Sequence, residues 1–203
     1  MRLLIFILSL LICSCNYLIK PKSKIVDNNF AAAIRRECPL CIDENNYLTY
    51  HAQTITELNI NGSNIRSLEG FHFDNLIIFH CDNNQITDLP DILPSNLEVL
   101  DCTNNQITDL PNTLPASLEL LYCGRNQITA LPNDLPANLR NLHCDNNQLT
   151  TLPNNLPLNL ERIMCKDNQL TTLPSNLPAS LSLFYYGNNP IKTLPENFPE
   201  RFK

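Results

Sequence analysis

Residues 97–117 read LEVLDCTNNQITDLPNTLPAS, and residues 118–138 read LELLYCGRNQITALPNDLPAN. The same pattern of 21 residues recurs in five further segments, without insertion or deletion. These segments begin at Ile55, Leu76, Leu139, Leu160 and Leu181. A fixed period of this length indicates a stack of repeated units rather than a single globular core. We therefore expect residues 55–201 to form one array of seven copies.

Each copy has the pattern of a short strand, a turn and an extended return. The first, fourth and sixth positions are apolar between mostly polar neighbours, which predicts a strand with one buried face. Two prolines four residues apart, such as Pro111 and Pro115, exclude a helix on the return and favour polyproline-like backbone. The ninth position is asparagine, whose amide can bond the backbone of the turn that ends the strand; this column is Asn84, Asn105, Asn126, Asn147, Asn168 and Asn189.

The pattern LxxLxCxxNxI resembles the leucine-rich repeat, with cysteine replacing leucine at the sixth position. The LPxxLP tails look like the short repeats of secreted bacterial effectors. The segment from Asn29 to ITELNINGSNIRSLEG (residues 55–70) is more similar to the N-terminal cap and first repeat of bacterial surface proteins. The resemblance implies an α/β-type repeat solenoid, a right-handed superhelix of mostly parallel β-structure with an extended, polyproline-like convex side and a short helical cap.

Such effectors often carry a separate catalytic domain, commonly a ubiquitin ligase. The residues after Arg201 leave no room for one, and we expect neither enzymatic activity nor a cofactor. The formal net charge of −6 argues against nucleic acid as a partner, because phosphate binding needs a basic surface.

Residues 1–15 predict an export signal. Arg2 precedes an apolar run from Leu3 to Ile12, which is shorter than the roughly 20 residues that a membrane-spanning helix needs. The stretch LICSC resembles a bacterial lipoprotein signal, although Cys13 stands where a smaller residue is more usual. In that interpretation Cys15 is lipidated and anchors the chain in a membrane of the cell envelope or at the cell surface. Cleavage of an ordinary signal, giving a secreted protein, is the alternative.

Residues 16–54 are expected to form a tether, over 16–24, and an N-terminal cap with a short helix over 26–36. Cys38 and Cys41 have a CxxC spacing that, in an exported chain, favours a local disulfide. At the other end only a tail, residues 202–203, follows the array. Strand 181–187 would then keep an unpaired edge through which the chain could self-associate.

The repeat cysteines are expected to be core residues, because they recur every 21 residues at an inward position, with Tyr186 taking that place in the last copy. They are Cys81, Cys102, Cys123, Cys144 and Cys165. Stacked side chains point the same way, so neighbouring thiols are poorly placed for disulfides and do not converge on a zinc ion. His80 and His143 share a column but stand about 14 Å apart, too far to share a metal. We therefore predict no metal site. His80 and Asp101 are neighbours that could hydrogen-bond, but no cysteine or serine nucleophile lies in the next column.

The third, fifth, seventh and eighth positions should project from the strand side, which in leucine-rich-repeat proteins is the concave, usual binding face. The third and fifth vary strongly within copies that otherwise barely vary, and they include residue types enriched at protein interfaces. Drift on an unconstrained solvated face is the alternative. The candidate ligand-binding residues are His80, Asp101, Tyr122, His143, Met164 and Tyr185 at the fifth position, and Ile78, Val99, Leu120, Asn141, Arg162 and Leu183 at the third.

The sequence thus predicts a non-enzymatic binding protein, tethered or secreted, that presents a rigid strand face to a protein or glycan ligand. A rigid array loses little conformational entropy on binding, so modest contacts suffice. Two alternatives remain: an exported effector that acts on a host cell through protein contacts, and a self-associating structural protein of the envelope.

Overall fold

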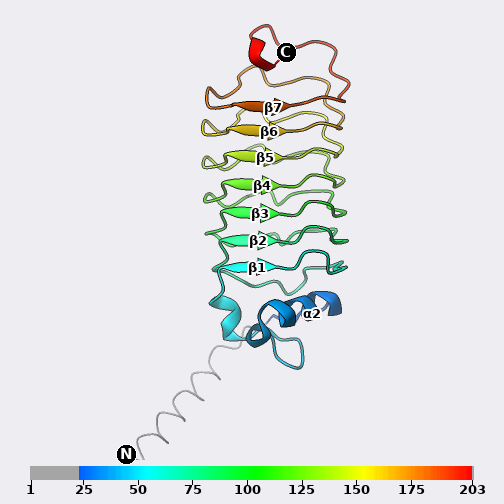
Figure 1. The fold of residues 1–203 in the computed structure, drawn as a ribbon, viewed down its shortest axis with the longest axis vertical. Helices are drawn as coiled ribbons and strands as arrows, with labels where there is room; N and C mark the ends of the chain where they lie inside the picture. The colour runs from blue at the N-terminus through cyan, green and yellow to red at the C-terminus, as the bar shows by residue number, and fades with distance from the viewer. Residues whose placement is uncertain (1–22, 203) are drawn as a thin grey trace, which may run out of the picture.

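The structure is a computed structural model and describes residues 23–202. Seven short parallel strands, one from each copy, follow one another in chain order along a nearly straight stack (Figure 1). This confirms the predicted repeat solenoid. The strands are β1 (Glu57–Asn59), β2 (Ile78–His80), β3 (Val99–Asp101), β4 (Leu120–Tyr122), β5 (Asn141–His143), β6 (Arg162–Met164) and β7 (Leu183–Tyr185).

The register of the sheet places equivalent positions of every copy side by side. Leu100 of β3 pairs with Leu121 of β4, and each strand pair in the ladder has the same offset of one copy. Within residues 23–202 the single α-helix is α2 (Asn28–Glu37), so the return segments are not helical. The return is short because its prolines cannot donate the backbone hydrogen bonds of a helix.

The core is a continuous column of apolar side chains inside the stack. In the copy that begins at Leu97, the side chains of Leu97, Leu100, Cys102 and Ile107 are fully buried, and those of Leu110 and Leu114 nearly so. The same positions are buried in the neighbouring copies. Because one copy is too thin to enclose its own apolar face, stacking is what creates this core.

The ninth-position asparagines tie successive copies together through the backbone. The Asn126 amide donates to the carbonyl oxygens of Cys102, Cys123 and Gly124 at 3.0–3.2 Å. Its side-chain oxygen accepts from the backbone N–H of Ile107 at 3.0 Å. Since Cys102 and Ile107 belong to the preceding copy, each asparagine joins its own turn to the one before it. The hydrogen-bonding role expected of this column is confirmed.

The cap is joined to the first copy by one aspartate with two functions. Asp27 is the N-cap of α2 and accepts from the N–H groups of Asn29 and Phe30 at 2.8 and 3.0 Å. Its other oxygen accepts from the N–H groups of Arg66 and Ser67. Burial alone would raise the pKa of Asp27, but these four backbone donors outweigh burial and lower it. The helix thus lies across the β1 end of the core (Figure 1).

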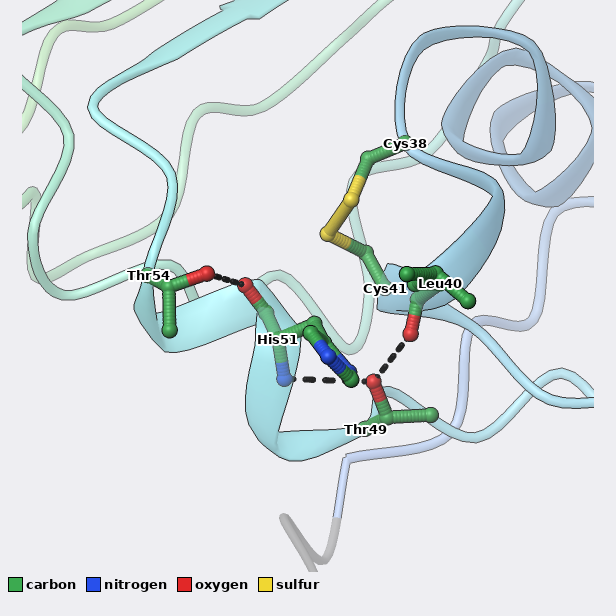
Figure 2. The surroundings of a disulfide bond; sticks show 6 residues. All are labelled: Cys38, Leu40, Cys41, Thr49, His51 and Thr54. Atoms are coloured by element: carbon green, nitrogen blue, oxygen red, sulfur yellow. Dashed lines mark hydrogen bonds between the residues drawn. A yellow bond between two sulfur atoms is a disulfide. The ribbon is translucent and has the colours of Figure 1, made fainter.

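A disulfide closes the turn after α2. The disulfide joins Cys38, the N-cap of η1 (Pro39–Cys41), to Cys41 at the end of that helix, and Figure 2 shows this bond beside η2 (Tyr50–Gln53). The hydroxyl of Thr49 donates to the carbonyl of Leu40 and accepts from the N–H of His51, which links the two short helices. The disulfide therefore belongs to a compact element of the cap.

Part of the predicted tether belongs to the cap. Lys24 forms an antiparallel bridge with Tyr47, so residues 23–24 are integrated into the folded cap, contrary to the tether boundary at residue 24. Gly70 makes this possible: its φ is +87°, and a Cβ there would lie 2.2 Å from the carbonyl oxygen of Lys24. The export signal, Cys15 and residues 16–22 lie outside the described residues. Within residues 23–202 no helix has the length and apolar character needed to cross a bilayer.

β7 keeps the unpaired edge that the sequence predicts, but the residues after it belong to the fold and do not form a tail. Residues 198–202 lie over the last copy, and the short helix η3 (Glu200–Phe202) stands beyond β7 (Figure 1). The ring of Phe202 packs against those of Phe184 and Phe198. The Tyr186 hydroxyl donates to the carbonyl of Phe202 at 2.8 Å. Phe202 is therefore part of the fold and not of a tail, because its ring helps to cover the apolar end of the stack. β7 remains the last strand of the sheet.

Candidate binding surface

The twelve candidate binding residues lie on one face of the sheet, which we call the strand wall. In each strand from β2 to β7 the middle residue is buried, and the residues before and after it are half-buried or exposed. Because alternate strand residues point to opposite faces, the third- and fifth-position side chains share this wall. The wall is a row of accessible side chains, a form suited to a large partner.

An apolar strip forms the side of the wall where the strands begin. Ile78, Val99 and Leu120 are paired in register on β2, β3 and β4, and all three are half-buried. The strip is interrupted by Asn141 and the exposed Arg162 before Leu183. Adjacent apolar side chains of this kind favour an interface over an idle surface.

Aromatic and basic side chains occupy the middle and C-terminal part of the wall. The rings of Tyr122 and His143 meet edge to face, with centroids 4.7 Å apart. Burial lowers the pKa of His143; Asp145 opposes this effect and Arg162 adds to it. The neutral form of the His143 imidazole is therefore favoured. The ammonium group of Lys166 lies 5.9 Å from the ring centroid of Tyr185.

At the fifth position, the N-terminal part of the wall is polar and acidic. His80 lies beside Asp101 across the β2–β3 pair, as the repeat register predicts, and Asp82 follows two residues after His80. One ligand-type atom from each of these three side chains lies within 4.8 Å of the other two. The repeat register predicts the pair of His80 and Asp101 but not Asp82 as a third member. The signal that could have found it is the spacing of His80 and Asp82, because residues two apart in an extended segment leave the chain on the same side.

A row of charges beside the wall forms modest ion pairs. Arg140 lies between Glu119 and Glu161, with N–O distances of 3.6 and 3.2 Å. All three side chains are substantially exposed, so water and salt screen these pairs and each contributes little to stability.

The repeat cysteines are buried free thiols, as predicted. Burial first, and nearby aspartates second, raise the pKa of Cys123 and of Cys165 to about 12. Burial is also the main reason why the pKa of the thiols of Cys81, Cys102 and Cys144 lies well above its ordinary value. Thiols of this kind stay protonated and are poor nucleophiles.

Comparisons with known proteins agree with this geometry. The family described as leucine-rich repeats (2 copies) matches residues 95–137. The leucine-rich-repeat domain of a Shigella effector is 26% identical, with a TM-score of 0.71, over 89% of this chain and 75% of that one. YopM, a leucine-rich effector of Yersinia pestis, is 30% identical, with a TM-score of 0.61, over 75% of this chain and 49% of its own.

A leucine-rich-repeat protein of Leptospira interrogans is 29% identical, with a TM-score of 0.57, over 62% of this chain and 34% of its own. The chain thus spans half or less of the Yersinia and Leptospira proteins. No curated protein sequence gives a significant match. Residues 95–137 thus match the leucine-rich-repeat family, and the whole array is similar in fold to the repeats of these bacterial proteins.

Proposed function

We propose that this leucine-rich-repeat chain is a non-enzymatic binding protein that holds a protein partner on the strand wall. The observation that carries the proposal is the contrast between columns of the repeat. The buried fourth and sixth positions hold apolar side chains, mostly leucine and cysteine, whereas the fifth position changes in nearly every copy. The stack is indifferent to the fifth position, so the presence there of tyrosine, methionine and histidine favours selection by a partner.

The rigid ladder supports binding without rearrangement. Each wall side chain stands on a strand that is paired on both sides, except at β1 and β7. A partner would therefore meet a preorganised surface and lose little free energy in ordering it. Tyr122 and Tyr185, at the fifth position of β4 and β7, offer large rings with polar ends and are the expected anchors.

For the location of this activity we propose the cell envelope, with the chain held by a lipid on Cys15. The support is the apolar run that ends at LICSC, a pattern of lipoprotein signals. A second candidate function is that of an exported effector that binds a host protein, and two of the similar structures belong to effectors of Shigella and Yersinia. Both functions use the same wall.

The test is protein cross-linking on intact cells with the double variant Tyr122→Ala/Tyr185→Ala. We expect recovery of the cross-linked partner to fall at least tenfold, because anchor residues of this type cost about 2 kcal/mol or more when truncated. The edge-to-face contact of Tyr122 with His143 is lost, so unfolding free energy should fall by only about 1 kcal/mol.

The matched control is Thr108→Ala/Thr129→Ala, two exposed positions outside the strand wall, of which Thr129 shares its copy with Tyr122. This variant should capture the partner as the wild type does. Unchanged capture by the tyrosine variant, or equal loss in the threonine control, would place the binding surface elsewhere.

A further inference from the structure

We propose that His80, Asp82 and Asp101 form a binding site for a divalent transition-metal ion, with zinc as the best-fitting type. The site lies at the N-terminal end of the strand wall, on β2, β3 and the residues just after β2. It does not depend on the proposed partner, because all three ligands come from this chain.

The backbone brings the three side chains together. His80 and Asp101 are direct partners in the parallel pair β2–β3, so their side chains leave the same face at neighbouring points. Asp82 leaves the chain two residues after His80. The three ligand atoms lie within 4.8 Å of one another, and small side-chain rotations would bring them to the spacing of about 3.3 Å found around tetrahedral zinc. No other such group of three occurs within residues 23–202.

Each carboxylate is held by one oxygen and keeps the other free. Asp101 Oδ1 accepts from the N–H of Thr103 at 3.0 Å, and Asp82 Oδ2 accepts from the side-chain amide of Asn83. Within residues 23–202 the second oxygen of each carboxylate and both ring nitrogens of His80 have no hydrogen-bond partner. Hydrogen bonds of this kind orient ligands without occupying the atom that binds the metal.

The two carboxylates also lack a compensating cation. Among the described residues no ion pair includes Asp82 or Asp101. All three side chains are half-buried, so the two negative charges are only partly screened by water. A divalent ion would neutralise both charges, and an imidazole with two carboxylates is a donor set that suits zinc.

A similar pair of side chains three copies later allows a comparison with this site. His143 and Asp145 repeat the spacing of His80 and Asp82 three copies later, but the residue beside His143 on the next strand is Met164. A thioether is a poor ligand for zinc, and one carboxylate is missing there. We therefore assign the site to the first cluster alone, where three protein ligands leave one zinc position open for water or another donor.

The test titrates the purified full chain with zinc chloride alone, by isothermal titration calorimetry after treatment with a chelator. The variant His80→Asn/Asp82→Asn/Asp101→Asn measures zinc bound elsewhere. We expect the wild type to bind one more equivalent than this variant. Asp101→Asn, which keeps an oxygen for the N–H of Thr103, should weaken that equivalent at least tenfold.

The second cluster supplies both the control and the converse experiment. His143→Asn should leave zinc binding unchanged, and Met164→Asp should add a second equivalent by completing the three-ligand set. Equal stoichiometry in the wild type and the triple variant would overturn the site, and so would equal loss in His143→Asn. No partner is present in the titration, so its result is separate from that of the cross-linking test.

Discussion

The ninth and fifth positions of the repeat lie only four residues apart but obey different rules. The ninth is asparagine in six successive copies, and the fifth holds asparagine, histidine, aspartate, tyrosine and methionine. The asparagine side chains bond the backbone of two copies, whereas the fifth-position side chains project from the wall. Identity is therefore constrained where a side chain completes the ladder, and it is free where the side chain only faces outward.

We expect the largest loss of stability when an asparagine of the ninth position is removed. Asn126→Ala leaves the N–H of Ile107 without its acceptor and removes a donor from the carbonyls of Cys102 and Cys123. We expect the free energy of unfolding to fall by about 2–4 kcal/mol, since unsatisfied buried polar groups are costly. Urea denaturation measures this loss. Asn141→Ala makes the same change on the wall and should cost less than about 1 kcal/mol; equal losses would contradict the distinction.

The next effect concerns the buried thiols and alkaline pH. The pKa of Cys123 rises from its ordinary 9.0 to about 12 in the folded chain, so this thiol stays protonated while the unfolded chain ionises. The unfolded state then binds fewer protons, and stability falls as pH rises from 9 towards 12. Between pH 9 and 11 the wild type should lose about 2–3 kcal/mol more than Cys123→Ala.

Urea unfolding at pH 7, 9, 10 and 11, under argon and without reductant, measures this difference. Asn141→Ala is the control, and its profile should run parallel to that of the wild type. Parallel profiles for Cys123→Ala and the wild type would mean that the Cys123 thiol is open to ionisation in the folded state.

We expect the smallest change in unfolding free energy at the turn that follows each strand. Arg125 has φ of +54°, in a left-handed position that asparagine holds in four other copies. Asparagine tolerates this backbone better than arginine does, so Arg125→Asn should raise the unfolding free energy by about 0.5–1 kcal/mol. Thermal denaturation detects this gain. Arg125→Ala removes the charge without easing the backbone, and a similar gain there would assign the effect to charge.

Much of the stack could be predicted because seven copies share the same pattern of apolar and polar positions. The alternation around Leu100 placed the strand, and the asparagine after it placed the turn. The helix expected over 26–36 spans Asn28–Glu37, with Asp27 as its N-cap. The twelve wall residues were placed on one face by period alone, because residues two apart in a strand share a face. Their role in binding stays a prediction.

The rest depends on segments outside the array, or on side chains that differ from copy to copy. The bridge of Lys24 with Tyr47 joins segments of the cap that share no pattern, so no period could reveal it. Phe198 and Phe202 turn back onto Phe184, which depends on the shape of the exposed end rather than on a local signal. The approach of Asp82 to Asp101 depends on side-chain direction across two strands, which a reading of single columns overlooks.

The uniform offset between copies has a genetic consequence. Because each strand bonds only its immediate neighbours, duplication or loss of one whole 21-residue segment leaves every remaining junction intact. A single-codon insertion would instead misalign an asparagine with the turn that it closes. Unequal recombination between similar segments can thus add or remove a copy in one event. The area of the strand wall then changes while the fold of the remaining copies stays the same.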